Sequence, residues 1–217
     1  MRYILIFIFT IITFSVSAQR KYIYDDYPEK KSFPIQLRTN GLYWCTLFPN
    51  IGIEAQTNYG LAFQLDYIGA WWNKNRTHHY YSGYAFQFET RYYINNILTK
   101  SGDNDNNAEN KALFMGFHAG IYLQMISFDF EFGGKGYMCN DLSKTIGVGV
   151  SGGYCMPLNE NFSLDFTLGI GWVTSDYKEY IPHGEYYVKT DDRKKNFFGP
   201  TKAEVSLAWN INNKTKE

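Results

Sequence analysis

The sequence predicts an all-β protein: an eight-stranded antiparallel up-and-down transmembrane β-barrel with a polar, packed lumen, preceded by a signal peptide. Alternation of apolar and polar residues with period two recurs eight times after residue 33, and a helical period of 3.6 is nearly absent. The chain also holds 19 Tyr, 17 Phe and 5 Trp at a mean hydropathy of −0.36. Because the rings are numerous but long apolar runs are not, a bundle of membrane helices and a disordered chain are both excluded.

The N-terminus has the order of a secretory signal. Arg2 precedes an apolar run over residues 3–14, which is too short to cross a bilayer as a helix, and small residues lead to a cleavage point after Ala18. We therefore expect four parts: a signal peptide over 1–18, a periplasmic segment over 19–32, the β-barrel over 33–212 and a C-terminal tail over 213–217.

Each alternating run separates an apolar face from a polar one. In the run over 162–172, for example, Phe166 and Leu168 lie on one face and Asp165 and Thr167 on the other. The predicted strands cover residues 33–45, 51–57, 61–70, 84–92, 113–125, 145–154, 162–172 and 202–209.

The spacers between the runs differ in length, as expected for short periplasmic turns and long external loops. Short turns are predicted at 47–50, 58–60 and 158–161, and long, polar, Tyr-rich external loops at 73–83, 131–143 and 175–197. Segment 95–111 is long where a short turn is expected, and its Asp, Asn and Gly residues predict a solvated insertion.

Run length and ring position favour a barrel with its apolar face outward. Five of the eight runs have about 10 to 13 residues, a length that matches the tilted strands that cross a bilayer, whereas soluble strands have about 5 to 6 residues. Rings near the strand ends predict aromatic girdles at the level of the lipid headgroups. The girdle residues are predicted to be Trp44, Trp71, Trp72, Tyr92, Tyr93, Trp172 and Trp209.

The polar faces then meet in the lumen. Its predicted network consists of Arg38, Glu54, Asp66, Glu89, Arg91, His118, Asp165, Lys202 and Glu204. An eight-stranded barrel has room only for side chains, so these charges must pair with one another. We expect glycines at 147, 149, 153, 169 and 171 to leave space for long residues from the opposite wall. The lumen is therefore predicted to be filled and closed to solutes.

Charge and cysteine content exclude several other classes. With 21 Lys and Arg against 21 Asp and Glu, no basic face for nucleic acid is indicated. Cys45, Cys139 and Cys155 show no C-x-x-C spacing, so neither a zinc site nor a redox motif is indicated. We predict no catalytic, cofactor-binding or metal-binding residues.

Five segments carry a family resemblance: "LFPNIGIEA" (47–55), "FETRYY" (88–93), "GFHAG" (116–120), "FSLDFTLGIGW" (162–172) and "FFGPTKAEVSLAW" (197–209). They resemble a Bacteroidetes family of exported proteins of unknown function that look like small outer-membrane β-barrels, with a last strand of the FGPTKA type. The resemblance covers about residues 35–211 and implies a barrel, but it brings no activity and no catalytic residues.

The function we expect is that of a non-enzymatic outer-membrane β-barrel with a structural or surface-interaction role through its external loops. Its expected partners are outer-membrane lipid, the barrel-assembly machinery, and surface protein or glycan at the loops. Two alternatives stay open. An outer-membrane lipid-modifying enzyme would need His118 to meet a nucleophile and an acid such as Ser127 and Asp129, and a soluble lipocalin-like carrier of a small apolar ligand would need its apolar face inside.

Overall fold

Strands make up nearly all of the part of the chain that the computed structural model describes, namely residues 34–57, 60–72, 80–94, 114–132, 134–159, 161–183 and 186–211. The elements in this part are β1 (Ile35–Asn40), α2 (Gly41–Cys45), β2 (Asn50–Gln56), β3 (Leu61–Trp72), β4 (Tyr80–Tyr93), β5 (Gly116–Phe132), β6 (Lys135–Cys139), β7 (Thr145–Pro157), β8 (Phe162–His183) and β9 (Tyr186–Asn210). The predicted signal peptide, the segment 19–32, the insertion 95–111 and the tail 213–217 lie outside the described residues.

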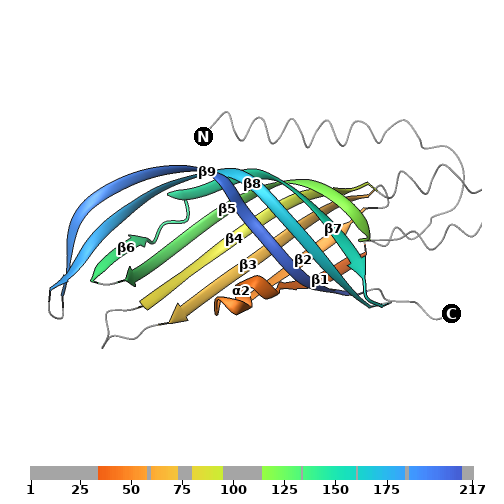
Figure 1. Ribbon diagram of the computed structural model, residues 1–217, viewed down its shortest axis with the longest axis horizontal. Coiled ribbons are helices and arrows are strands. Elements are labelled where there is room, and N and C mark those ends of the chain that lie inside the picture. Colours follow the sequence, from red (N-terminus) through yellow and green to blue (C-terminus); the bar gives the residue numbers. More distant parts are fainter. Residues whose placement is uncertain are drawn as a thin grey trace, which may run out of the picture. The chain divides into compact units, whose positions relative to one another are not determined.

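All the strands belong to one antiparallel sheet, which confirms the predicted all-β class, and the pairing of this sheet closes on itself. β1 pairs with β2, and pairing continues through β3, β4, β5, β7, β8 and β9, which returns to β1. Eight strands thus form a closed ring (Figure 1). The ninth, β6, was not predicted; it pairs with β5 and β8 beyond the start of β7.

The two ends of the ring are built differently. At the terminal rim, where β1 begins and β9 ends, tight turns join β2 to β3 and β7 to β8. Gly60 closes the first of these turns with φ of 86°, a value that glycine adopts without a steric penalty. At the distal rim, the opposite end, lie α2, the β5–β6 connection and the long β8–β9 hairpin (Figure 1).

The first strand is shorter than predicted. We expected it to run over 33–45, but β1 stops at Asn40 and a helical turn follows. The Asn40 side-chain oxygen accepts a hydrogen bond from the backbone nitrogen of Leu42 at 3.0 Å, which caps α2 at its N-terminus. Trp44 therefore lies in a helix and not at the end of a strand.

Two of the predicted external loops are wrong because they are mostly strand. Residues 135–139 of the expected loop 131–143 form β6, and the expected loop 175–197 is the paired outer half of β8 and β9. The expected loop 73–83 also ends early, since β4 begins at Tyr80. β9 pairs with β1 only from Ser206 to Asn210, so among the described strands residues 186–205 form backbone pairs with β8 alone.

The ring has polar side chains inside and apolar side chains outside. In β3, Gln64 and Asp66 are buried, whereas Phe63 is 43% exposed and Leu65 50% exposed. The same alternation continues around the ring. Exposed apolar side chains on its outer face include Ile53, Phe63, Leu65, Phe88, Phe117, Ile121, Val148, Val150, Phe166, Leu168, Ile170 and Leu207. In a soluble sheet packed on an apolar core, the apolar side chains would face inward and the polar side chains outward.

Glycines inside the ring are covered by side chains that come from one or two strands away, and not from the opposite wall as predicted. A Cβ at Gly169 or Gly171 of β8 would come within 2.8 Å of the Tyr122 side chain, which extends from β5 across β7. His118, also on β5, lies in the same way over Gly153 of β7. These glycines therefore leave the volume that large β5 side chains fill.

Candidate functional site: a charged network inside the ring

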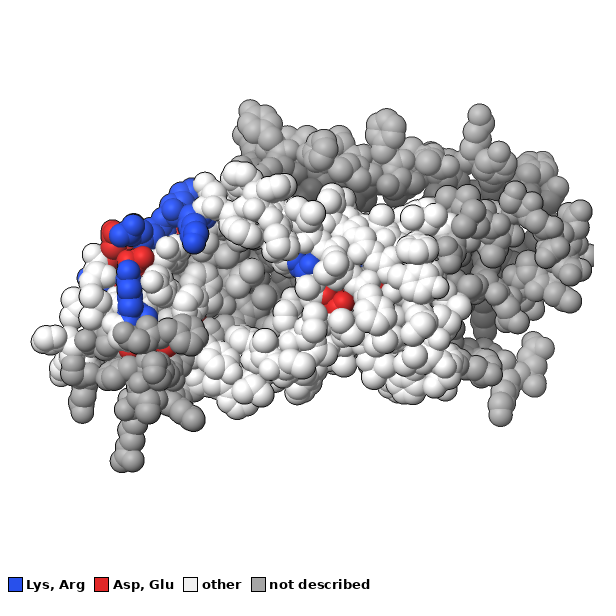
Figure 2. Space-filling view, in the orientation of Figure 1, with Lys and Arg blue, Asp and Glu red and all other residues white. Residues whose placement is uncertain are grey.

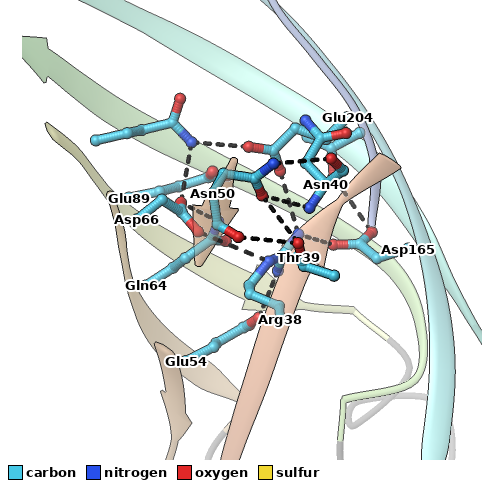
Figure 3. A network of polar contacts seen from close by, with 12 residues as sticks. Arg38, Thr39, Asn40, Asn50, Glu54, Gln64, Asp66, Glu89, Asp165 and Glu204 are labelled. Carbon is cyan, nitrogen blue, oxygen red and sulfur yellow. Dashed lines mark hydrogen bonds and ion pairs between the residues drawn. The ribbon is translucent and has the colours of Figure 1, made fainter. Parts of the chain in front are cut away.

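Arg38 on β1 connects four strands from inside the ring. Its Nη1 donates to Glu54 Oε2 of β2 at 2.7 Å, and its Nη2 donates to Asp165 Oδ2 of β8 at 2.8 Å. The same Nη2 lies 3.1 Å from Glu204 Oε2 of β9. Figure 3 shows the guanidinium surrounded by these carboxylates. Because Arg38 is buried, this geometry replaces the water that its charge would otherwise need.

Arg91 on β4 meets the same carboxylates from the other side. Its Nη1 donates to Asp165 Oδ2 at 2.7 Å, and its Nη2 lies 3.2 Å from Glu89 Oε2 and 3.3 Å from Glu204 Oε2. Asp165 and Glu204 are thus shared by two guanidinium groups. Strands β1, β4, β8 and β9 are thereby connected through side chains across the interior.

A second layer of the network lies toward the distal rim. Lys202 forms an ion pair with Glu89 and lies 3.2 Å from Glu204 Oε1. Gln87 Nε2 donates to Glu204 Oε1 at 2.9 Å and to Asp66 Oδ2 at 3.2 Å. These contacts extend the network across the interior to β3, which carries Asp66.

Carboxylates outnumber the fixed cations in this network. Arg38, Arg91 and Lys202 face Glu54, Asp66, Glu89, Asp165 and Glu204. His118 Nε2 lies 2.9 Å from Asp165 Oδ1. Tyr93 Oη donates to Glu54 Oε1 at 2.9 Å. Multiple contacts thus hold these carboxylates in place, and all five are buried.

The nine residues predicted to form the lumen network are all buried inside the ring. Several further members were not included in the predicted network. They are Gln36, Gln64, Gln87, Tyr93, Gln124, Ser151 and Thr167. Most were identifiable from strand parity, because each lies two residues from another inward-facing position.

One of the predicted girdle residues is on the wrong face. Tyr93 is 0% exposed and belongs to the interior network, because it is two residues beyond the inward-facing Arg91. The other six predicted girdle rings, Trp44, Trp71, Trp72, Tyr92, Trp172 and Trp209, are exposed. Trp72, at the end of β3, also donates from its Nε1 to the Leu47 carbonyl at 2.7 Å.

The strand geometry separates the residues that a lipid-modifying enzyme would need. His118 and Ser127 are nine residues apart on the same strand, β5, which corresponds to about 30 Å at 3.3 Å per residue. Asp129 lies still further along. Thr167 Oγ1 is 3.4 Å from His118 Nε2, but both residues are buried. Within the described ranges, no three His, Cys, Asp or Glu side chains are placed to hold a metal ion.

Surface charges gather on the β8–β9 hairpin beyond the ring (Figure 2). Arg193 Nε lies 2.9 Å from Asp191 Oδ2, and a hydrogen bond from Lys189 lowers the pKa of Asp192. On β6, a hydrogen bond with Glu179 raises the pKa of Lys135. The Arg193–Asp191 and Lys189–Asp192 pairs are solvent-exposed and contribute little to stability, so the hairpin has a charged, hydrated surface.

Comparison with known proteins identifies a family but no characterised relative. Residues 4–211 match the family described as "Protein of unknown function (DUF3575)". No curated protein matches the chain, and no solved structure matches it. Of the described residues, no helix is long and apolar enough to cross a membrane.

Proposed function

The chain belongs to this family of proteins of unknown function, and we propose that it is a non-enzymatic outer-membrane β-barrel. In this proposal the eight-stranded ring spans the membrane after removal of a signal peptide. The distal rim faces the outside of the cell and has a structural or surface-interaction role. Outer-membrane lipid and the barrel-assembly machinery are the direct partners, and protein or glycan would contact the β8–β9 hairpin. An origin in Bacteroidetes stays a prediction.

The observation that carries this proposal is the sidedness of the ring. Its interior is charged and hydrogen-bonded, and its exterior carries large exposed apolar side chains. The ring closes through the pairing of β1 with β9 from Ser206 to Asn210, so no strand edge is left unpaired at that level. A hydrocarbon environment requires such closure. Apolar side chains of this number and size would cause aggregation in water, whereas lipid tails solvate them. A carrier of an apolar ligand would need the reverse sidedness.

Cell fractionation tests the proposal. We expect the protein in the outer-membrane fraction, and we expect an unheated sample to migrate differently from a boiled one on a denaturing gel, because a closed strand ring resists the detergent until heated. The mature N-terminus should be Gln19. A protein recovered from the aqueous periplasm with no heat-dependent shift would contradict the proposal and favour the soluble carrier.

The filled interior predicts that the protein conducts no solutes. Arg38, Arg91 and Lys202 form ion pairs across the interior with carboxylates on other strands. Purified protein in planar bilayers should therefore show no stable channel openings, and liposomes that contain it should not swell in small sugars. A general porin at the same density is the positive control. Steady single-channel currents would contradict the prediction that the interior is closed to solutes.

A further inference from the structure

Two cavities open on the inner face of the distal rim, between the charged network and the β8–β9 hairpin tip. One, of about 530 Å³, is lined by residues that include Phe48, Ile68, Tyr81, Ile126, Phe128 and Phe130. The other, of about 540 Å³, is lined by Ile126, Phe128, Phe130, Tyr137, Val173 and Phe197 among others. Because they share three residues of β5, they adjoin, and together they are called the distal vestibule here. Each has a volume typical of small-molecule sites.

The wall of the vestibule is aromatic. On β5, the ring centroids of Phe128 and Phe130 lie 5.4 Å apart, and Phe130 lies 5.3 Å from Tyr137 of β6. Tyr177 of β8 continues this surface, 5.9 Å from Tyr137. All four side chains are half-buried, so they still expose ring area to the cavity. They point inward, and lipid contact therefore does not account for them.

The vestibule contains one unbalanced positive charge. Its acidic lining residue, Glu179, is already paired, with Lys135 Nζ at 3.0 Å and Arg193 Nε at 3.7 Å. Lys195 lines the same cavity opposite Ser175 and forms no ion pair with any other described residue. An apolar wall beside a free ammonium group is complementary to an apolar molecule with one negative charge.

We propose that the distal vestibule binds a singly anionic amphiphile, such as a medium-chain fatty acid. The chain packs on Phe128 and Phe130, and the carboxylate pairs with Lys195. The site rests on the proposed function in one respect: if the distal rim faces outward, the amphiphile arrives from outside the cell.

Equilibrium dialysis of radiolabelled decanoate against the full-length protein in phosphatidylcholine nanodiscs tests this site, with empty nanodiscs as the blank. We expect saturable binding of one decanoate per chain above the blank. Competition by decyltrimethylammonium should be at least tenfold weaker than competition by unlabelled decanoate. Binding no greater than the blank, or equal competition by the cation, would overturn the proposal.

Neighbouring residues on β9 supply matched variants. Lys195→Gln should weaken decanoate binding about tenfold, because a charge-assisted contact is lost. Lys194→Gln removes the same charge from the other face, where Lys194 Nζ lies 3.7 Å from Asp176 Oδ1, and should leave binding unchanged. Phe197→Ser should weaken binding and Phe198→Ser should not, since only Phe197 lines the cavity. Equal effects within either pair would contradict the assigned site.

The failure of this proposal is distinguishable from failure of the proposed function. If the protein is heat-modifiable and lies in the outer membrane but binds no decanoate, only the amphiphile site is contradicted. If it is soluble in the periplasm but binds decanoate in a Lys195-dependent way, only the membrane proposal is contradicted. The heat-dependent gel shift of each variant checks that it has folded.

Discussion

Arg91→Met is expected to destabilise the protein by about 3–5 kcal/mol, because the substitution removes one of the cations that neutralise the buried carboxylates. Asp165 and Glu204 would each lose one of their two guanidinium partners, and Lys202 would be the one cation of the network still paired with Glu89. Methionine fills much of the volume but neutralises nothing. Urea titration of protein refolded into vesicles, followed by the heat-dependent gel shift, measures this loss.

The control is Arg193→Met on the β8–β9 hairpin. Arg193 also forms ion pairs, with Asp191 and Glu179, but its side chain is solvent-exposed. Such a pair contributes about 0–1 kcal/mol, so the midpoint of unfolding should scarcely move. If both substitutions had the same small effect, the interior would be wetter and less tightly paired than its distances indicate.

Leu168→Arg is expected to cost about 2–4 kcal/mol and to reduce assembly into the outer membrane. Leu168 is 71% exposed in the middle of the outer face of β8. In water, arginine at so exposed a position would change stability by no more than about 0.5 kcal/mol. A large loss therefore distinguishes a hydrocarbon environment from an aqueous one. The amount of heat-modifiable protein in isolated outer membranes and its unfolding midpoint in vesicles are the measurements.

Val188→Arg is the matched control for that substitution. Val188 is also an exposed apolar residue, 53% exposed, but it lies on β9 near the tip of the hairpin, beyond the ring. We expect this variant to assemble and unfold like the wild type. Equal tolerance of both arginines would indicate that water surrounds the whole outer face, and the membrane proposal would then fail.

The alternation of residues predicted the interior of the ring well, because strand parity alone decides which side chains face inward. Arg38, Glu54 and Asp165 could each be assigned to the polar face of its run. Their contacts could not be predicted, since Arg38 and Asp165 are 127 positions apart and meet only through the register of the closed ring. A shift of one residue in that register would move every polar side chain to the outside.

Tyr93 shows where the same rule was not applied far enough. It is a ring near a strand end, which is the feature that predicts a girdle residue. Counting in steps of two from Arg91 places Tyr93 on the inner face, as the structure does. Chemical type was therefore a weaker guide than parity.

The outer half of the β8–β9 hairpin could not be predicted from alternation. Where one face of a strand meets an apolar environment and the other a polar one, apolar and polar residues must alternate along it. Beyond the ring both faces meet water, so residues such as Lys194 and Lys195 carry no such pattern. Backbone pairing alone makes this segment a strand, and the sequence resembles that of a loop.

The narrow contact between β1 and β9 has a consequence for how the ring closes. This seam runs only from Gln36 opposite Asn210 to Asn40 opposite Ser206, and it joins the first described strand to the last. Contacts of such sequence separation form late, because the whole intervening chain must be ordered first. Arg38 Nη2 donates to Glu204 Oε2 across this seam, between residues 166 positions apart in the sequence, and this contact stabilises the closed ring. We expect backbone amides of β1 to exchange with solvent faster than those of β4, which has long partners on both sides.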